Sequence, residues 1–189
     1  MSHVATLPEE SLDIFAPVVV PLKNPPLAAL LAWLWPGAGH IYQGRYGKGI
    51  LFMVCILVTY FFGLAMSDGH AVYASFRRPD IRYPYIFQVG VGIPALPAIV
   101  QNRLVRSGKA PMFGSTIMAP PARYDEQKHD EAASWWAKSG FFFELGSLYT
   151  MIAGLLNFMV IYDAYAGPLF TTPGKRPPPD DDAGSERNS

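Results

Sequence analysis

Long blocks without a charged residue constrain this chain more than any other feature of its sequence. Ile50 to Met66 contains no charge in 17 residues, and Leu145 to Tyr162 contains none in 18. A helix of this length is about 25 Å long, close to the thickness of the hydrocarbon core of a bilayer. Hydrophobic residues make up 50% of the chain, and most of the charged 16% lie between the blocks. This grouping predicts an integral membrane protein.

Four blocks of this kind predict an all-α membrane fold, a four-span helical bundle. The first block, Pro26 to Trp35, is about 15 Å long as a helix, half the hydrocarbon thickness. It spans only if the helix continues past Pro36 to about Tyr42, with a kink where the proline frees the carbonyl of Ala32. The alternative is a half-helix that re-enters on the same side, which leaves three spans. The third block, 83–100, holds two glycines and two prolines, so we expect it to be bent.

The blocks divide the chain into seven predicted segments. Trp135 and Trp136 close the longest connection, and indole rings favour the headgroup level, so we expect an interfacial amphipathic helix there. Consecutive prolines and aspartates after residue 176 predict a disordered end. In order, the segments are a Pro-rich N-terminal tail (1–25), a two-helix membrane hairpin (26–66), a polar loop (67–82), a bent third span (83–100), the connection with the interfacial helix (101–139), a fourth span (140–167) and a disordered C-terminal tail (168–189).

The charge balance excludes some partners but does not decide the orientation. With 15 basic and 15 acidic residues the formal net charge is zero, so no overall field favours nucleic acid. In the four-span topology seven Lys and Arg lie on one side and eight on the other, which leaves the positive-inside rule undecided. If the first block re-enters, nine Lys and Arg lie on the side of the N-terminus and six on the other. The positive-inside rule then places the N-terminus inside. Orientation stays open, in what we expect to be a bacterial cytoplasmic membrane.

A glycine-rich segment between the first two blocks is the sharpest local motif. It runs from Pro36 to Gly49, and its last 13 residues contain five glycines together with a histidine, two tyrosines and two basic residues. Glycine allows close backbone approach, so we interpret the segment as a tight turn between two membrane helices. A phosphate-binding loop is a poor alternative, because no strand precedes the segment and no Lys-Ser/Thr pair follows it.

The pattern Pro-Gly-x-Gly-His-x-Tyr-x-Gly-Arg, followed by Lys-Gly and an apolar helix, resembles the two-transmembrane-helix ("TM-two") domain family over about residues 23–66. The resemblance implies a membrane hairpin with a short Gly-rich linker, and it implies no reaction. The family more commonly has an Arg and an aromatic residue where this chain has a single Ile41. The remainder resembles uncharacterised bacterial membrane proteins. The matching positions are Gly37, Gly39, His40, Tyr42, Gly44, Arg45 and Gly49.

Small residues recur every four positions on the fourth span. Gly146, Thr150 and Gly154 share one helix face, and Asn157 falls close to it. Small residues let another helix approach, and an asparagine can donate and accept across the contact. We therefore predict a helix-packing face made by these four residues. An ion path through Glu144, Asn157 and Asp163 is the alternative, although Glu144 and Asp163 lie about 28 Å apart along a helix, at opposite interfaces.

Groups for catalysis or metal binding do not converge in this sequence. The histidines lack ligand spacing, and we expect His40 to cap the turn at the interface. We therefore expect no enzyme, no cofactor and no metal. The leading hypothesis is a small scaffold or accessory subunit that acts by helix–helix contacts, with the lipid bilayer and either its own copies or another membrane protein as partners, and not nucleic acid. The alternative is a small transporter or channel subunit whose path is lined by Asn157 and the bent third span.

Overall fold

The computed structural model describes residues 22–76, 81–112, 117–121 and 131–167, and every regular element in these ranges is a helix. The all-α prediction is confirmed for this part of the chain, which forms one compact unit from Leu22 to Gly167. The predicted tails before residue 22 and after residue 167 lie outside the described residues. So do 77–80 of the predicted polar loop and 113–116 and 122–130 of the predicted connection.

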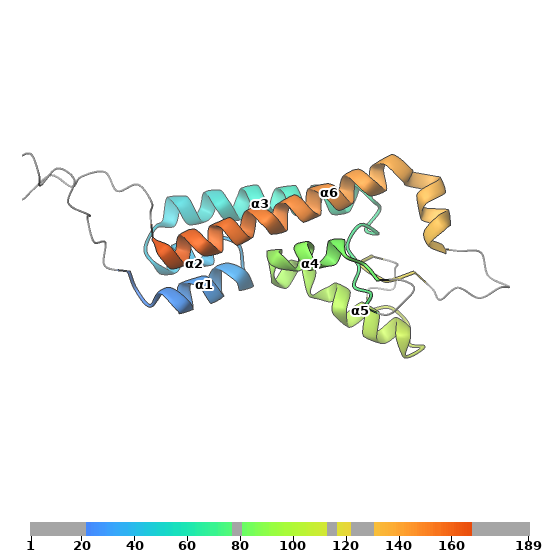
Figure 1. Cartoon of the computed structure of the whole chain (residues 1–189), viewed down its shortest axis with the longest axis horizontal. Helices are drawn as coiled ribbons and strands as arrows, with labels where there is room; N and C mark the ends of the chain where they lie inside the picture. Colours follow the sequence, from blue (N-terminus) through green and yellow to red (C-terminus); the bar gives the residue numbers. More distant parts are fainter. Residues whose placement is uncertain (1–21, 77–80, 113–116, 122–130, 168–189) are drawn as a thin grey trace, which may run out of the picture. The chain divides into compact units, whose positions relative to one another are not determined.

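Two long helices lie side by side and form the body of the unit (Figure 1). Helix α3 spans Tyr46–Met66, and α6 spans Glu131–Ala166. Both are long and apolar enough to cross a membrane, by length and composition. They run antiparallel, because Lys48 at the start of α3 contacts Asp163 at the end of α6. Two of the four predicted spans therefore stand as candidate spans, whereas the other two blocks are broken into shorter helices.

The first block forms a helical hairpin rather than one kinked helix. Helix α1 (Pro25–Leu34) stops just before Pro36, and the short α2 (Ala38–Tyr42) follows. Gly37 makes the turn with φ of 80°, and a methyl group on its Cα would collide with the carbonyl oxygen of Gly49. The continuous helix from Pro26 through Pro36 to Tyr42, which a four-span bundle requires, does not form. Pro36 interrupts the hydrogen-bonded ladder, and the positive φ of Gly37 allows the chain to reverse.

Both ends of this hairpin lie at the same end of α6. Leu22, just before α1, packs near Gly167, and Gln43, just after α2, donates from Nε2 to the carbonyl of Ala164 at 2.6 Å. The chain therefore enters and returns on one side. This geometry matches the re-entrant alternative for the first block and differs from the four-span arrangement.

The third block also turns back on itself. Helix α4 (Pro84–Gln88) continues into a 3₁₀ turn, η3 (Val89–Val91); a second, η4 (Ile93–Ala95), leads into α5 (Pro97–Arg106). Gly92 sits between the turns with φ of 82°. Ser75 contacts both ends of the segment, since its carbonyl accepts from the Arg82 backbone N–H at 3.0 Å and its hydroxyl oxygen accepts from the Arg106 guanidinium at 3.2 Å. The predicted bent span over 83–100 is thus a second hairpin.

The two hairpins enter from opposite ends of the long helices and meet at their tips (Figure 1). A methyl group on Gly92 would collide with the carbonyl oxygen of Trp33 and would lie 2.7 Å from that of Leu34. One hairpin followed by one long helix thus occurs twice, as α1–α2–α3 and as α4–α5–α6, in opposite directions. The two tips pack against each other and against α6 in the interior of the unit.

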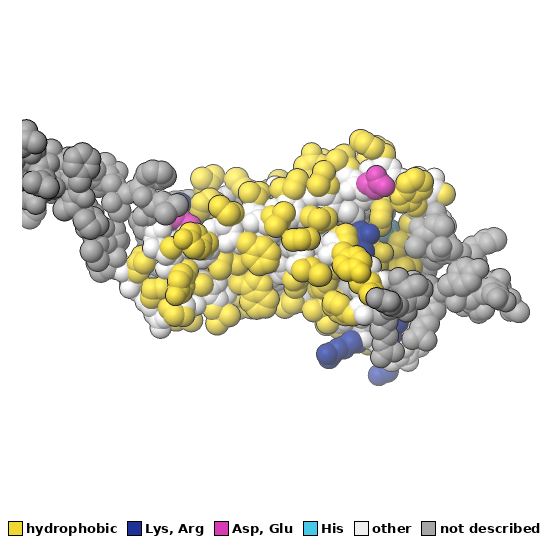
Figure 2. Space-filling model, in the orientation of Figure 1, with side chains coloured by type: hydrophobic (Ala, Val, Ile, Leu, Met, Phe, Trp, Pro, Cys, Tyr) yellow, Lys and Arg dark blue, Asp and Glu magenta, His cyan; other side chains and the backbone are white. Residues whose placement is uncertain are grey.

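Helix α6 is longer than the predicted fourth span, because residues 131–139 continue into it. Figure 1 shows its first turns running at an angle to the rest. The ring of Trp135 packs on His70 with centroids 4.3 Å apart, which ties this part of the predicted interfacial helix to the end of α3. Apolar side chains cover the middle of the face in Figure 2, and charged side chains lie toward its ends.

Candidate functional site

Asn157 joins both hairpin tips to α6. Its side-chain nitrogen donates to the carbonyl of Ala32 in α1 at 3.0 Å and to the carbonyl of Gly90 in η3 at 2.8 Å. Each of these carbonyls lies four residues before a proline, Pro36 and Pro94, which has no N–H to offer it. The asparagine, itself fully buried, thus supplies the donors that the two prolines lack.

Two tyrosine hydroxyls satisfy further carbonyls at the second tip. Tyr60 of α3 donates to the carbonyl of Pro94 at 3.1 Å, and Tyr85 of α4 donates to that of Ala95 at 2.9 Å. Both rings are buried, with 0% and 2% exposure. Because an unpaired buried carbonyl costs roughly 1–3 kcal/mol, these contacts hold the irregular backbone in place.

A second buried polar group lies nearer the Ser75 end. The side-chain nitrogen of Gln88 donates to the hydroxyl of Thr150 at 2.9 Å and to the carbonyl of Ala71 at 3.1 Å. The Thr150 hydroxyl donates in turn to a carbonyl of its own helix, that of Gly146 at 2.9 Å. Within the described residues the side-chain oxygens of Gln88 and Asn157 are buried and have no hydrogen-bond partner.

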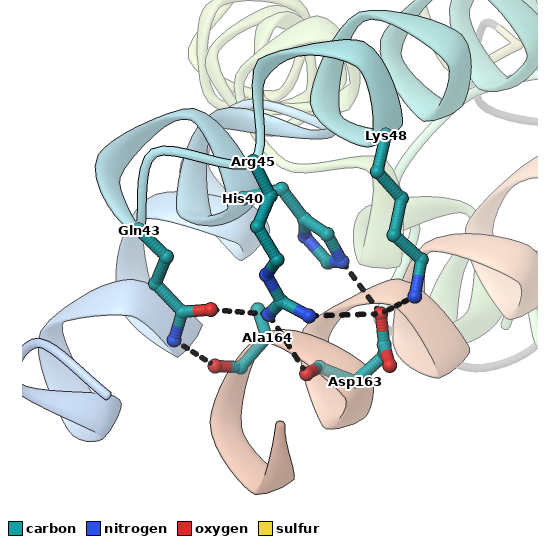
Figure 3. Close-up of polar contacts among 6 residues, drawn as sticks. All are labelled: His40, Gln43, Arg45, Lys48, Asp163 and Ala164. Carbon is teal, nitrogen blue, oxygen red and sulfur yellow. Dashed lines mark hydrogen bonds and ion pairs between the residues drawn. The ribbon is translucent and has the colours of Figure 1, made fainter. Parts of the chain in front are cut away.

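At the opposite end, four side chains form a charged cluster, which we define as His40, Arg45, Lys48 and Asp163 (Figure 3). His40 Nε2 and Lys48 Nζ each lie 2.6 Å from Asp163 Oδ2, and Arg45 Nη1 lies 4.0 Å from the same oxygen. His40 has no exposed surface, and its ring packs edge-on against Phe52 at 5.1 Å between centroids. The cluster therefore fastens the α2 turn and the start of α3 to the end of α6.

The same turn caps the last carbonyls of α6. Gln43 donates to the carbonyl of Ala164, and the Arg45 guanidinium donates to that of Asp163 at 3.4 Å and to the side-chain oxygen of Gln43. Carbonyls in the last turn of a helix have no partner within it, and polar or basic side chains stabilise them. Arg45 Nε and Nη1 are buried without a hydrogen bond in the described part of the chain.

An apolar groove begins at this cluster. It has a volume of about 420 Å³ and lies between α3 and α6, with Lys48 and Asp163 at one end and Ile56 and Leu156 among the lining residues farther along. Cys55 also lines it. The charged cluster therefore lies at one end of an apolar groove, an arrangement that suits an amphipathic ligand.

A half-buried arginine, Arg82, lies at the other end of the long helices. Arg82 Nη2 donates to the hydroxyl of Ser147 at 2.7 Å and to the carbonyl of Ala71 at 3.2 Å, and its guanidinium lies over the rings of Tyr73 and Phe143. Burial lowers the pKa of the Arg82 guanidinium, while Tyr73 acts in the opposite direction. Arginine side chains keep their proton in proteins, so the Arg82 guanidinium stays charged.

The residues singled out from the sequence fall into two places. Of the predicted helix-packing face, Gly146 abuts Gly63 of α3 and Ser67 just after that helix, and Gly154 abuts Phe87. Thr150 and Asn157 are fully buried on the same side. Glu144 is exposed and bonds Trp136 at 3.2 Å, far from Asp163, as the helix rise requires. The predicted turn residues Gly37, Gly39, His40, Tyr42, Gly44, Arg45 and Gly49 all lie in or beside the α1–α2 hairpin.

Sequence reasoning missed the partners of these residues. The sequence predicts that His40 caps the turn at the interface, and it gives no partner for the ring; in the structure the ring is buried and bonded to Asp163, 123 positions away. The pairing of Lys48 with Asp163 was also missed. One signal was present: in an antiparallel pair, Lys48 at the start of one span lies level with Asp163 at the end of the other. In the described residues no group of three or more His, Cys, Asp or Glu side chains is placed to hold a metal ion.

A family model described as a family of unknown function, DUF6677, matches residues 27–177. No curated protein and no solved structure matches the chain. The matched range includes the two hairpins, both long helices, the charged cluster and Asn157, so the family pattern extends well beyond the 23–66 segment that resembles the two-helix domain.

Proposed function

Since the chain belongs to this family of unknown function, DUF6677, we propose from its geometry that it is a small integral membrane scaffold or accessory subunit. Two helices, α3 and most of α6, cross the bilayer, and two re-entrant hairpins fill the space beside them from opposite sides. The protein acts through helix–helix contacts with its partners in a bacterial cytoplasmic membrane, and it needs no cofactor for this role.

The outer faces of the long helices support the membrane location. They expose large apolar side chains. Exposing apolar surface to water costs about 25 cal/mol of free energy for each Å². Lipid solvates such faces without cost. Charged groups lie at the two ends instead, with Lys48 and Asp163 at one and Arg82 at the other. The exposed apolar residues include Leu51, Val54, Val58, Phe61, Leu155, Leu156 and Met159.

The observation that carries the scaffold proposal is the satisfaction of the hairpin tips by protein donors. Asn157, Tyr60 and Tyr85 donate to carbonyls that the broken helices leave free. In transport proteins, unwound backbone at the bilayer midplane commonly faces an ion or a substrate. Here it faces buried side chains, which supports a packed and rigid interior.

Cysteine accessibility tests the topology. In a Cys55→Ala background, single cysteines replace the exposed residues Lys23, Gly47, Phe76 and Lys109, and an impermeant thiol reagent is applied to spheroplasts and to inverted vesicles. We expect positions 23 and 47 to react from one side and positions 76 and 109 from the other. A four-span bundle would place 23 opposite 47 and 76 opposite 109, which would overturn the hairpin topology.

The positive-inside rule orients this topology. In the described residues the end near Ser75 carries five basic residues and the end near Gly167 carries three. We therefore expect positions 76 and 109 to react from the cytoplasmic side. This orientation is opposite to the one expected for a re-entrant first block alone, because the third block also turns back and brings Arg103, Arg106 and Lys109 to the Ser75 end. The five are Arg82, Arg103, Arg106, Lys109 and Lys138, and the three are Lys23, Arg45 and Lys48.

One observation favours the second candidate, a transporter or channel subunit. The side-chain oxygens of Asn157 and Gln88 are buried without a partner among the described residues, and such oxygens accept readily from water or a cation. Reconstituted vesicles with a panel of monovalent-ion and proton flux dyes separate the two candidates. The scaffold proposal expects no flux above that of empty vesicles. Flux in the wild type that Asn157→Leu removes would overturn it, with Thr59→Val as the matched control.

A further inference from the structure

The groove between α3 and α6 is neither a core cavity nor part of the hairpin packing. It starts at Lys48 and Asp163 and reaches Ile56, eight residues along α3, a distance of about 12 Å. Its rim side chains Leu51 and Met159 are 59% and 69% exposed, so the groove opens on the outer face of the helix pair. A ligand that fills it must be long, thin and apolar over most of its length.

The charges at the mouth of the groove favour an anion. Two permanent cations, Lys48 and Arg45, contact one carboxylate, Asp163, so one positive charge is left over even when His40 is neutral. The Lys48 side chain is 40% exposed and reaches the surface. The Arg45 side chain is 22% exposed, and its Nε and Nη1 atoms are buried without a hydrogen bond in the described residues. A guanidinium beside an ammonium provides the positive charge that a phosphate group prefers.

We propose that this groove binds one anionic phospholipid, with its phosphate at Arg45 and Lys48 and one acyl chain along Phe52, Cys55 and Ile56. The inference rests on the membrane location proposed above. The groove is apolar and ends in the charged cluster at the level of the headgroups. A phospholipid can fill the groove with an acyl chain, whereas a soluble phosphate has no apolar part to place there. The cationic surplus distinguishes an anionic lipid from a zwitterionic one.

Native mass spectrometry of the full chain tests the proposal. The protein is released from nanodiscs that contain equal amounts of phosphatidylglycerol and phosphatidylcholine, and the retained lipid is counted. We expect one retained lipid, with phosphatidylglycerol preferred about tenfold. Lys48→Gln with Arg45→Gln removes the preference, Lys48→Arg keeps it, and Lys109→Gln at the other end leaves it unchanged. Equal retention of the two lipids by the wild type, or a preference that the double variant keeps, overturns the proposal.

A second measurement needs no variant and so avoids any effect on folding. Cys55 is the only cysteine of the chain and lines the groove, so bound lipid should slow its reaction with a small apolar maleimide. The protein is held in detergent micelles to which one lipid is added. We expect phosphatidylglycerol to protect Cys55 from the maleimide more strongly than phosphatidylcholine does. Glycerol 1-phosphate, which has the headgroup charge without the chains, should give no protection. Equal protection by both lipids, or full protection by glycerol 1-phosphate, contradicts a lipid site.

Carbonate extraction separates this proposal from the one on which it rests. A chain that stays in carbonate-washed membranes but shows no lipid preference retains its proposed membrane role and loses the lipid site. A chain that carbonate releases into solution fails both.

Discussion

The side-chain nitrogen of Asn157 lies 3.0 Å from the carbonyl oxygen of Ala32, the carbonyl that Pro36 leaves without a donor. The same amide nitrogen donates a second hydrogen bond to the carbonyl oxygen of Gly90, which lies four residues before Pro94. One buried side chain on a long helix therefore compensates for two proline breaks on two different hairpins. This relationship explains how a chain with 18 prolines can keep irregular backbone in its interior.

Replacing Asn157 with leucine should destabilise the tips of both hairpins. Two interhelical hydrogen bonds are lost, which costs about 1–2 kcal/mol in a membrane protein. Thermal unfolding in detergent measures the loss, and hydrogen exchange should report faster opening of residues 88–96. Thr59→Val is the control, because the Thr59 hydroxyl bonds only a carbonyl of its own helix, that of Cys55. Equal stability of the two variants would contradict the role of Asn157.

Replacing Asp163 with asparagine should loosen the charged cluster. Buried His40 and the ammonium of Lys48 both lose a charged acceptor, and a hydrogen bond to a charged group is worth about 2 kcal/mol. The melting temperature should fall, and proteolysis near Gly44 should become faster. Glu144→Gln is the matched control, since Glu144 is exposed and bonds one exposed indole. If the control lost as much stability as Asp163→Asn, the cluster would have no special role.

Alanine at Gly92 should be far more harmful than alanine at Gly108. Both glycines have positive φ, 82° and 73°, so both substitutions strain the backbone by about 1 kcal/mol or more. At Gly92 the new methyl group also collides with the carbonyl of Trp33, whereas nothing lies within 4 Å at Gly108. The difference in unfolding free energy between the two variants isolates the contact between the hairpin tips. No difference would mean that the tips do not touch.

Leucine at Gly146 should separate the long helices, and leucine at Gly140 should not. A side chain at 146 meets the carbonyl of Gly63 and the Cβ of Ser67, while position 140 has no neighbour within 4 Å. Overpacking of this kind costs about 1–3 kcal/mol. Leucine at 140 should be neutral or stabilising by about 0.5–1 kcal/mol, because glycine is a poor helix former. Cysteine cross-linking between α3 and α6 can confirm that only the first variant moves them apart.

Several features of the fold follow from local patterns in the chain. The charge-free runs around Val54 and Ala153 predict the two long helices, since only lipid or a large core can take that much apolar surface. The four-residue spacing of Gly146, Thr150 and Gly154 predicts a face that another helix can approach. Pro36 was recognised as a residue that frees the carbonyl of Ala32. Each of these inferences uses residues within a few turns of one another.

The meeting of the hairpin tips, the seating of His40 on Asp163 and the choice between spanning and re-entry depend on groups more than 50 residues apart. No local preference selects them: a proline break tolerates either a kink or a reversal, and the outcome is set by which distant donor can reach the freed carbonyl. Asn157 donates to the carbonyls of Ala32 and Gly90 in the arrangement in which both hairpins turn back, and pairing these buried carbonyls stabilises that arrangement.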